Sequence, residues 1–114
     1  MTFSIAGRCA RTGMFGIAVS SSSPSVAARC AHVRAGVGAV STQNVTDPRL
    51  GPKWLDLMAT GLSAEAALAR LVAEAPKIEY RQLALVDAAG GTASYSGAKT
   101  LGTHATARGK DVVA

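Results

Sequence analysis

The chain opens with Met1-Thr2, and Thr2 is a residue type that can act as a nucleophile. Threonine is small enough for an aminopeptidase to remove the Met before it, which would leave the hydroxyl beside a free α-amine. An α-amine with a pKa of about 8 can accept the hydroxyl proton while the oxygen attacks an amide carbonyl. The alternative is that Thr2 only begins a strand.

Two amides and an imidazole are candidates for assisting such an attack. Gln43 and Asn44 follow a predicted strand, where they can donate hydrogen bonds to an oxyanion or make ordinary loop contacts. His104 can transfer protons or bind an anion, although the sequence provides no evident partner for it. Asp47 precedes Pro48 and is predicted to form an Asx turn rather than to act as a base.

The sequence predicts no metal site and no other cofactor. Its His, Cys, Asp and Glu residues lack metal-ligand spacing, and Gly36 and Gly38 do not open a helix as a phosphate-binding loop would. Cys9 and Cys30 fit no metal or redox spacing. We expect both thiols to be reduced and to pack as small apolar side chains.

Composition predicts one small domain with few large core side chains. The 114 residues are 48% apolar but only 4% aromatic. The net charge of +5 arises from basic residues scattered between Arg8 and Lys110, without interleaved aromatic side chains. This pattern argues against nucleic-acid binding and favours an anionic small substrate or an acidic partner. Because the sequence shows neither a secretory signal nor a membrane span, we expect a cytoplasmic protein without membrane association.

The elements that must position these residues begin with hairpins. Residues 2–6 and 15–19 are rich in strand formers and are separated by a glycine-containing turn. Residues 26–33 are compatible with either a helix or a strand, and residues 37–42 form a strand that would complete a second hairpin. A polar loop is expected over residues 43–49.

Two helices and a third hairpin follow. Trp54, Leu55, Leu57 and Met58 share one helical face behind Pro52, with Gly61 placed to end the helix. Ser63 is a predicted N-cap for a second helix, whose apolar residues recur with helical periodicity from Ala64 to Ala75. Residues 82–86 and 92–95 flank a Gly-Gly turn. The order of elements, four strands, two helices and then further strands, predicts a mixed sheet that carries helices on one face and lacks its remaining layer.

Several segments together resemble the DUF1028 family. They occur in the family's order and cover most of the chain: Thr2-Phe3-Ser4-Ile5, Gly16-Ile17-Ala18-Val19-Ser20, Arg34-Ala35-Gly36-Val37-Gly38-Ala39-Val40, Thr42-Gln43, Gly51-Pro52, Gly61-Leu62-Ser63-Ala64, Tyr80-Arg81-Gln82 and Val86-Asp87. The resemblance implies an α+β fold of the N-terminal-nucleophile (Ntn) hydrolase type, a four-layer αββα sandwich. This chain would supply most of the sheets and two helices.

The resemblance also implies that residues 1–114 are the N-terminal half of such a domain, because family members are roughly twice as long. A second chain or a C-terminal segment would complete it, and a higher oligomer is expected. Since Ntn hydrolases commonly mature by autoproteolysis, a chain ending at Ala114 resembles the first product of such a cleavage. The nucleophile would then be either Thr2 or the first residue of that second chain.

Proteasome-like Ntn hydrolases carry an Asp after the second strand and a Lys on the third, and both tune the nucleophile. This chain has no carboxylate at the first place. The resemblance implies substrate binding by Ser20, Ser21 and Ser23, by Arg34 and by His104. For the serines, the residue types themselves favour a turn that caps a strand end. At the place of the Lys the chain offers Arg29, His32 or Arg34.

The leading hypothesis is therefore an Ntn-type amidohydrolase subunit. It would hydrolyse an amide, imide or cyclic ureide C–N bond of a small polar or anionic substrate through an acyl-enzyme, with Thr2, Gln43 and Asn44 as catalytic residues. The step from fold to function is an analogy. The alternatives are a non-catalytic subunit that binds a ligand or partner with the same fold, and a fragment with no function of its own.

Overall fold

The computed structural model describes residues 1–114 and contains two antiparallel sheets and three helices, so the fold class is α+β. In chain order, the elements are β1 (Thr2–Arg8), β2 (Phe15–Ser21), α1 (Ala27–Cys30), β3 (Ala31–Arg34), β4 (Gly38–Asn44), α2 (Leu50–Ala59), α3 (Ala64–Glu74), the 3-10 helix η1 (Ile78–Tyr80), β5 (Arg81–Asp87), β6 (Thr92–Ser96), β7 (Arg108–Gly109) and β8 (Val112–Val113).

The first sheet has the strand order β2-β1-β8-β7. The predicted N-terminal hairpin forms one side of this sheet, with β2 at the edge; in it Thr2 lies opposite Ser21 and Arg8 lies opposite Phe15. The apolar residues near the end of the sequence form β8, which pairs with the other edge of β1 at Ala6. The hairpin prediction is confirmed, and residues distant in sequence complete the sheet.

The second sheet has the order β3-β4-β5-β6. Residues 26–33, which are compatible with either structure, form both, because α1 is followed directly by β3. The loop predicted over residues 43–49 is wrong at its start. Gln43 and Asn44 belong to β4, because they pair with Gln82 and Arg81 of β5. The predicted hairpin of β5 and β6 is confirmed.

Both predicted helices are present. The Ser63 hydroxyl accepts a hydrogen bond from the Ala66 backbone N–H and caps α3. The preceding helix, α2, begins two residues before Pro52 and is followed by Gly61, whose φ of +100° is a conformation that glycine adopts without a steric penalty. Local sequence signals therefore define the helix boundaries to within about two residues.

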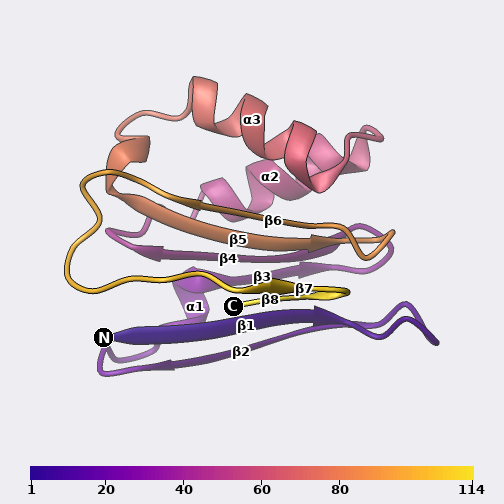
Figure 1. Ribbon diagram of the computed structural model, residues 1–114, viewed down its shortest axis with the longest axis horizontal. Helices are drawn as coiled ribbons and strands as arrows, with labels where there is room; N and C mark the ends of the chain where they lie inside the picture. The colour runs from indigo at the N-terminus through magenta and orange to yellow at the C-terminus, as the bar shows by residue number, and fades with distance from the viewer.

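The elements form layers, with α2 and α3 covering one face of the second sheet while the first sheet packs against its other face (Figure 1). One core cluster lies between helices and sheet and is built around Trp54, Leu71 and Leu85. The other lies between the two sheets and contains small side chains: Ala6, Ala39, Ala84, Val86 and Val113. The scarcity of large aromatic residues thus corresponds to two closely packed sheets.

The outer face of the first sheet exposes apolar side chains. Side chains alternate along β1, so Ala6 is buried between the sheets while Phe3 and Ile5 point outward. Phe3 is 67% exposed and Ile5 is 46% exposed.

Gly97 allows a close approach between the end of β6 and η1. A Cβ at position 97 would collide with the backbone of Glu79, whereas a Cβ at Gly16 on the outer face of β2 would meet no atom within 4 Å. We expect Gly97→Ala to lower the free energy of unfolding by about 1–3 kcal/mol, because the backbone must shift. Urea denaturation, with Gly16→Ala as the control, measures this difference. Equal midpoints for the two variants would contradict it.

The two cysteines differ in environment. Cys30 is buried, as expected, but Cys9 is exposed because it follows β1 in the turn of the first hairpin. The packing role predicted for Cys9 is therefore wrong. No helix of the chain is both long enough and apolar enough to span a membrane.

Candidate functional site

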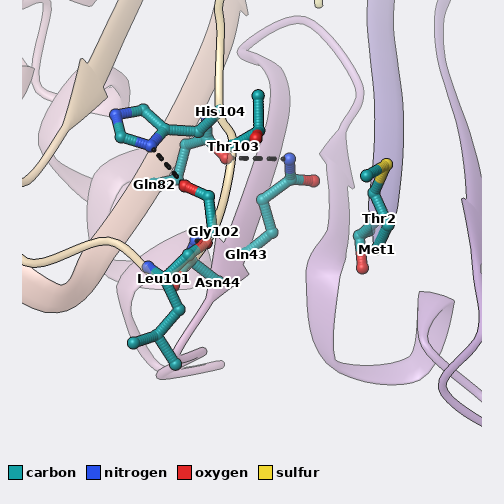
Figure 2. A pocket seen from close by; sticks show the side chains of 9 residues that line it. All are labelled: Met1, Thr2, Gln43, Asn44, Gln82, Leu101, Gly102, Thr103 and His104. Atoms are coloured by element: carbon teal, nitrogen blue, oxygen red, sulfur yellow. Dashed lines mark hydrogen bonds between the residues drawn. The ribbon is translucent and has the colours of Figure 1, made fainter.

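The candidate site is a cavity of about 390 Å³ where the start of β1, the end of β4 and the segment after β6 meet (Figure 2). Because β4 runs toward the end of the molecule at which β1 begins, residues more than forty positions apart face one cavity. It brings together four residues predicted from the sequence, namely Thr2, Gln43, Asn44 and His104. The remaining lining residues are Met1, Gln82, Leu101, Gly102 and Thr103.

Thr2 lies at the first position of β1 and is half-buried. Its hydroxyl lies 2.8 Å from the Ser21 hydroxyl, because the two residues are paired across the hairpin. The α-amine of Met1 donates a hydrogen bond to the Ser22 hydroxyl at 3.2 Å. The start of β1 is therefore held against the end of β2 by serine side chains.

Gln43 extends from β4 between the two sheets. Its Oε1 accepts a hydrogen bond from the Ser41 hydroxyl at 3.4 Å, and its Nε2 donates to Oε1 of Gln82 at 3.2 Å. The oxygen of the same Ser41 hydroxyl lies 2.9 Å from the Ser4 hydroxyl on β1. These contacts fix the orientation of the Gln43 amide and leave its second N–H without a protein acceptor.

Gln82 is a lining residue with a polar role that is not among the site residues predicted from the sequence. It lies on β5 and is 7% exposed. Its Nε2 donates to the Ser96 hydroxyl and to the Ala105 carbonyl oxygen, each at 3.3 Å, so both of its N–H groups are used. The available signal was a glutamine within the otherwise apolar run Gln82-Leu83-Ala84-Leu85-Val86. A buried amide at such a position needs partners, and here it orients Gln43.

Asn44 holds the segment that covers the cavity. Its Nδ2 donates to the Leu101 carbonyl oxygen at 3.2 Å, and its Oδ1 accepts from the Leu101 N–H at 2.9 Å. The residue has a φ of +72°, a conformation for which asparagine is one of the preferred non-glycine residues. One Nδ2–H remains without a protein acceptor.

His104 reaches the cavity from that covering segment. Its Nδ1 lies 3.2 Å from the Gly102 carbonyl oxygen and 3.1 Å from the Thr100 hydroxyl. The residue is exposed, and both contacts come from its own segment. No carboxylate accompanies the imidazole, so it is placed to contact a ligand at the cavity mouth rather than to form a catalytic dyad.

The other predicted binding residues do not line this cavity. Of the serines, only Ser21 contacts Thr2, since Ser20 lies opposite Phe3 on the outer face and the backbone N–H of Ser23 donates to the Ser21 hydroxyl. The turn predicted for these serines is thus present. Arg34 pairs with Asp56 at 2.8 Å and lies opposite Gly38, at the other end of β4 from Asn44. Gly38 and Asn44 are six residue steps apart along β4, a distance of about 20 Å.

A second cavity of about 360 Å³ adjoins the first, and the two share six lining residues: Met1, Thr2, Gln43, Gln82, Thr103 and His104. It extends between the start of β1 and the segment that leads to β7. Its remaining lining residues are Phe3, Ser4, Ala105, Thr106, Ala107 and Ala114. Thr2 lies at the junction of the two cavities.

Asp47 stabilises the loop that follows Asn44. Its Oδ1 accepts from the Arg49 backbone N–H at 3.1 Å, which is the predicted Asx turn, and the Arg49 guanidinium pairs with both carboxylate oxygens. The Asp47 side chain is 9% exposed. The hydrogen bonds from Arg49 hold the pKa of Asp47 below its ordinary value of 3.8.

Because this pKa is lower in the folded protein, the resulting stabilisation is complete above the unfolded pKa of about 4 and is lost as the pH falls through the folded value. We expect Asp47→Asn to lower the free energy of unfolding at pH 7, and the difference from the wild type to shrink as the pH falls below about 4. Urea denaturation between pH 7 and pH 3 tests this. The control is Asp56→Asn, whose exposed ion pair contributes little. A difference that grows on acidification would contradict the expectation.

No group of three or more His, Cys, Asp or Glu side chains in the chain is arranged to hold a metal ion. The cavity therefore offers hydroxyl, amide and imidazole groups to a ligand, together with backbone groups of the covering segment.

Comparisons with known proteins agree with this fold. Protein SPO2555 from Silicibacter pomeroyi, a DUF1028 protein of known crystal structure, superimposes with a TM-score of 0.93 at 23% sequence identity. The alignment covers 98% of this chain but 50% of that protein, so this chain spans about half of its length. No curated protein matches the chain significantly. The sequence model of DUF1028, described as a family of unknown function, matches residues 2–114. The chain therefore belongs to the DUF1028 family.

Proposed function

We propose that this chain is part of an amidohydrolase of the Ntn type that cleaves an amide, imide or cyclic ureide C–N bond in a small polar molecule. The observation that supports this most directly is the position of Thr2. It is the first residue of β1, and it lines both cavities together with the amide-bearing Gln43. Removal of Met1 would place a free α-amine on the same residue as the hydroxyl.

The proposed reaction has two steps. The Thr2 Oγ1 attacks the substrate carbonyl carbon while its proton passes to the Thr2 α-amine. The C–N bond then breaks, the proton passes to the leaving nitrogen and an ester links the acyl group to Thr2. In the second step water attacks this ester, the α-amine accepts a proton from the water, and the acid is released as the hydroxyl is restored.

Amide groups of the cavity are suited to stabilise the oxyanion formed in both steps. Gln43 retains one Nε2–H without a protein acceptor, and its orientation is set by hydrogen bonds to Ser41 and Gln82. Asn44 also retains one Nδ2–H, although its main contact is with Leu101. Donors held in place before the reaction stabilise developing charge without a reorganisation cost.

We further propose that a second half of the domain completes a four-layer αββα sandwich. Two observations support this: the exposed Phe3 and Ile5 on the outer face of the first sheet, and the coverage of only half of the crystallised DUF1028 protein. That half would lie on a second chain or on a longer form of this one. It would bury the apolar outer face.

The first experiment is intact-mass analysis and N-terminal sequencing of every polypeptide in the purified assembly, before and after treatment with an acylating amide analogue. We expect this chain to begin at Thr2 and to gain the mass of one acyl group. If Met1 is retained and the label appears on a second chain that begins with Thr, Ser or Cys, the nucleophile lies there and this chain forms the pocket wall. Absence of label from every chain would reject the hydrolase.

A non-catalytic binding subunit is the second candidate. The contacts of the two groups that would react favour it. The Met1 α-amine donates a hydrogen bond to the Ser22 hydroxyl, and the Thr2 hydroxyl is hydrogen-bonded to the Ser21 hydroxyl. Retention of Met1 in an assembly that takes up no label, together with reversible ligand binding at the cavity, would support this candidate.

A further inference from the structure

The two adjoining cavities have one ionisable side chain in their walls, the imidazole of His104. No Lys, Arg, Asp or Glu lines either of them. The other polar side chains that line both cavities are the hydroxyls of Thr2 and Thr103 and the amides of Gln43 and Gln82. The Asn44 amide is found only in the first cavity, and the hydroxyls of Ser4 and Thr106 only in the second. Amides both donate and accept hydrogen bonds, so they match a ligand that does the same.

The lysine and arginine side chains that give the chain its net positive charge do not line the cavities. Most basic side chains are paired with carboxylates, as Arg8 is with Asp111 and Lys99 with Glu79. The basic residues without a carboxylate partner do not line either cavity; they are Arg11, Arg29, Lys77, Arg81 and Lys110. A carboxylate ligand would lose hydration and find only His104 and the α-amine of the chain as possible cationic partners. The proposed reaction requires that amine to be uncharged so that it can accept a proton.

The second cavity differs from the first in its walls. The residues found only there are mostly small, including Ala105 and Ala107, whereas those found only in the first are Asn44, Leu101 and Gly102. The site thus has a half rich in hydrogen-bonding groups and a more apolar half, with Thr2, Gln43 and Gln82 between them.

We propose that the substrate is an uncharged amide that carries a small apolar substituent: the amide head lies against Gln43 and Asn44, and the substituent lies against Ala105 and Ala107. This deepens the proposed function and rests on it, because it assumes that the Thr2 cavity is the substrate site. It also replaces the anionic substrate that net charge alone suggests with a neutral one.

The test compares three probes on the complete native protein carrying Thr2→Ala, which removes turnover. Two of the probes are matched in shape and differ in charge, and the third is shorter. Pentanamide has the amide head and an alkyl substituent, pentanoate replaces the head with a carboxylate, and acetamide lacks the substituent. Binding is followed through the side-chain amide NMR signals of Gln43 and Gln82. We expect pentanamide to bind at least about tenfold more tightly than either of the others, a difference of about 1.4 kcal/mol.

Two alanine variants locate the substituent. Ala107→Leu fills the second cavity and should remove the advantage of pentanamide over acetamide, while leaving acetamide binding unchanged. Ala69→Leu, at an equally exposed alanine in the groove between α3 and β6, should change neither. Equal or tighter binding of pentanoate, or no response of Gln43 and Gln82 to any probe, would overturn the inference. Preference for pentanamide by a wild-type protein that forms no acyl-enzyme would support the inference while rejecting the hydrolase.

Discussion

Thr2→Ala is expected to abolish amide hydrolysis, lowering kcat by at least about 10³-fold, because loss of an attacking group leaves only binding and oxyanion stabilisation. The substitution removes the hydroxyl at the junction of the two cavities and little else, since the Thr2 side chain has one hydrogen bond, to Ser21. Steady-state assay with the amide that labels the wild-type protein provides the measurement.

Two variants separate chemistry from structure. Thr2→Ser retains a hydroxyl beside the α-amine and should retain acyl-enzyme formation detectable by intact mass. Ser20→Ala removes a hydroxyl on the outer face, opposite Phe3, and should leave the rate unchanged. An active Thr2→Ala protein would show that Thr2 is a strand residue and that the nucleophile lies elsewhere.

Trp54→Ala is expected to lower the free energy of unfolding by about 3–5 kcal/mol, enough to unfold a small domain of ordinary stability. Trp54 is fully buried between α2 and the second sheet, in the core cluster that includes Leu71 and Leu85. Its Nε1 also donates to the Ala64 carbonyl oxygen at 3.4 Å. Thermal and urea unfolding, followed by circular dichroism, measure the loss.

The matched variants divide this effect into packing and hydrogen bonding. Trp54→Phe retains most of the apolar contact and loses the bond to Ala64, so it should be less destabilising than Trp54→Ala. Met14→Ala, at a residue that is 70% exposed in the first hairpin turn, should lie within about 0.5 kcal/mol of the wild type. Near wild-type stability of Trp54→Ala would show that the helices contribute little to the core.

Four residues of the candidate cavity could be identified before the fold was known, because their chemistry is visible in their type. Thr2 is recognisable from its place behind Met1, Gln43 and Asn44 from their amides after a predicted strand, and His104 from its imidazole. Their exact partners were not predictable. The pairing of Asn44 with Leu101 joins residues 57 positions apart, and no local pattern encodes such a contact.

Arg34 and Ser20 show what residue type alone leaves undetermined. Both side chains could bind a polar substrate. Arg34, however, lies opposite Gly38, at the end of the second sheet remote from the cavity, and Ser20 points to the outer face of the first sheet. In a sheet, a shift of one residue reverses the face on which a side chain lies, and a shift of several moves it to the other end. Gln82 shows the converse, since its neighbours predict a buried strand and conceal its polar role.

The sequence by itself determined the hairpins, the two long helices, their caps and the family, because turn residues, helical periodicity and capping depend on residues close along the chain. Only the tertiary structure decided that β8 pairs with β1 and that the two sheets pack face to face. It also decided that Thr2, Gln43 and Gln82 face one cavity. Those arrangements arise from burying apolar surface between elements distant in sequence, a driving force without direction that local patterns do not specify.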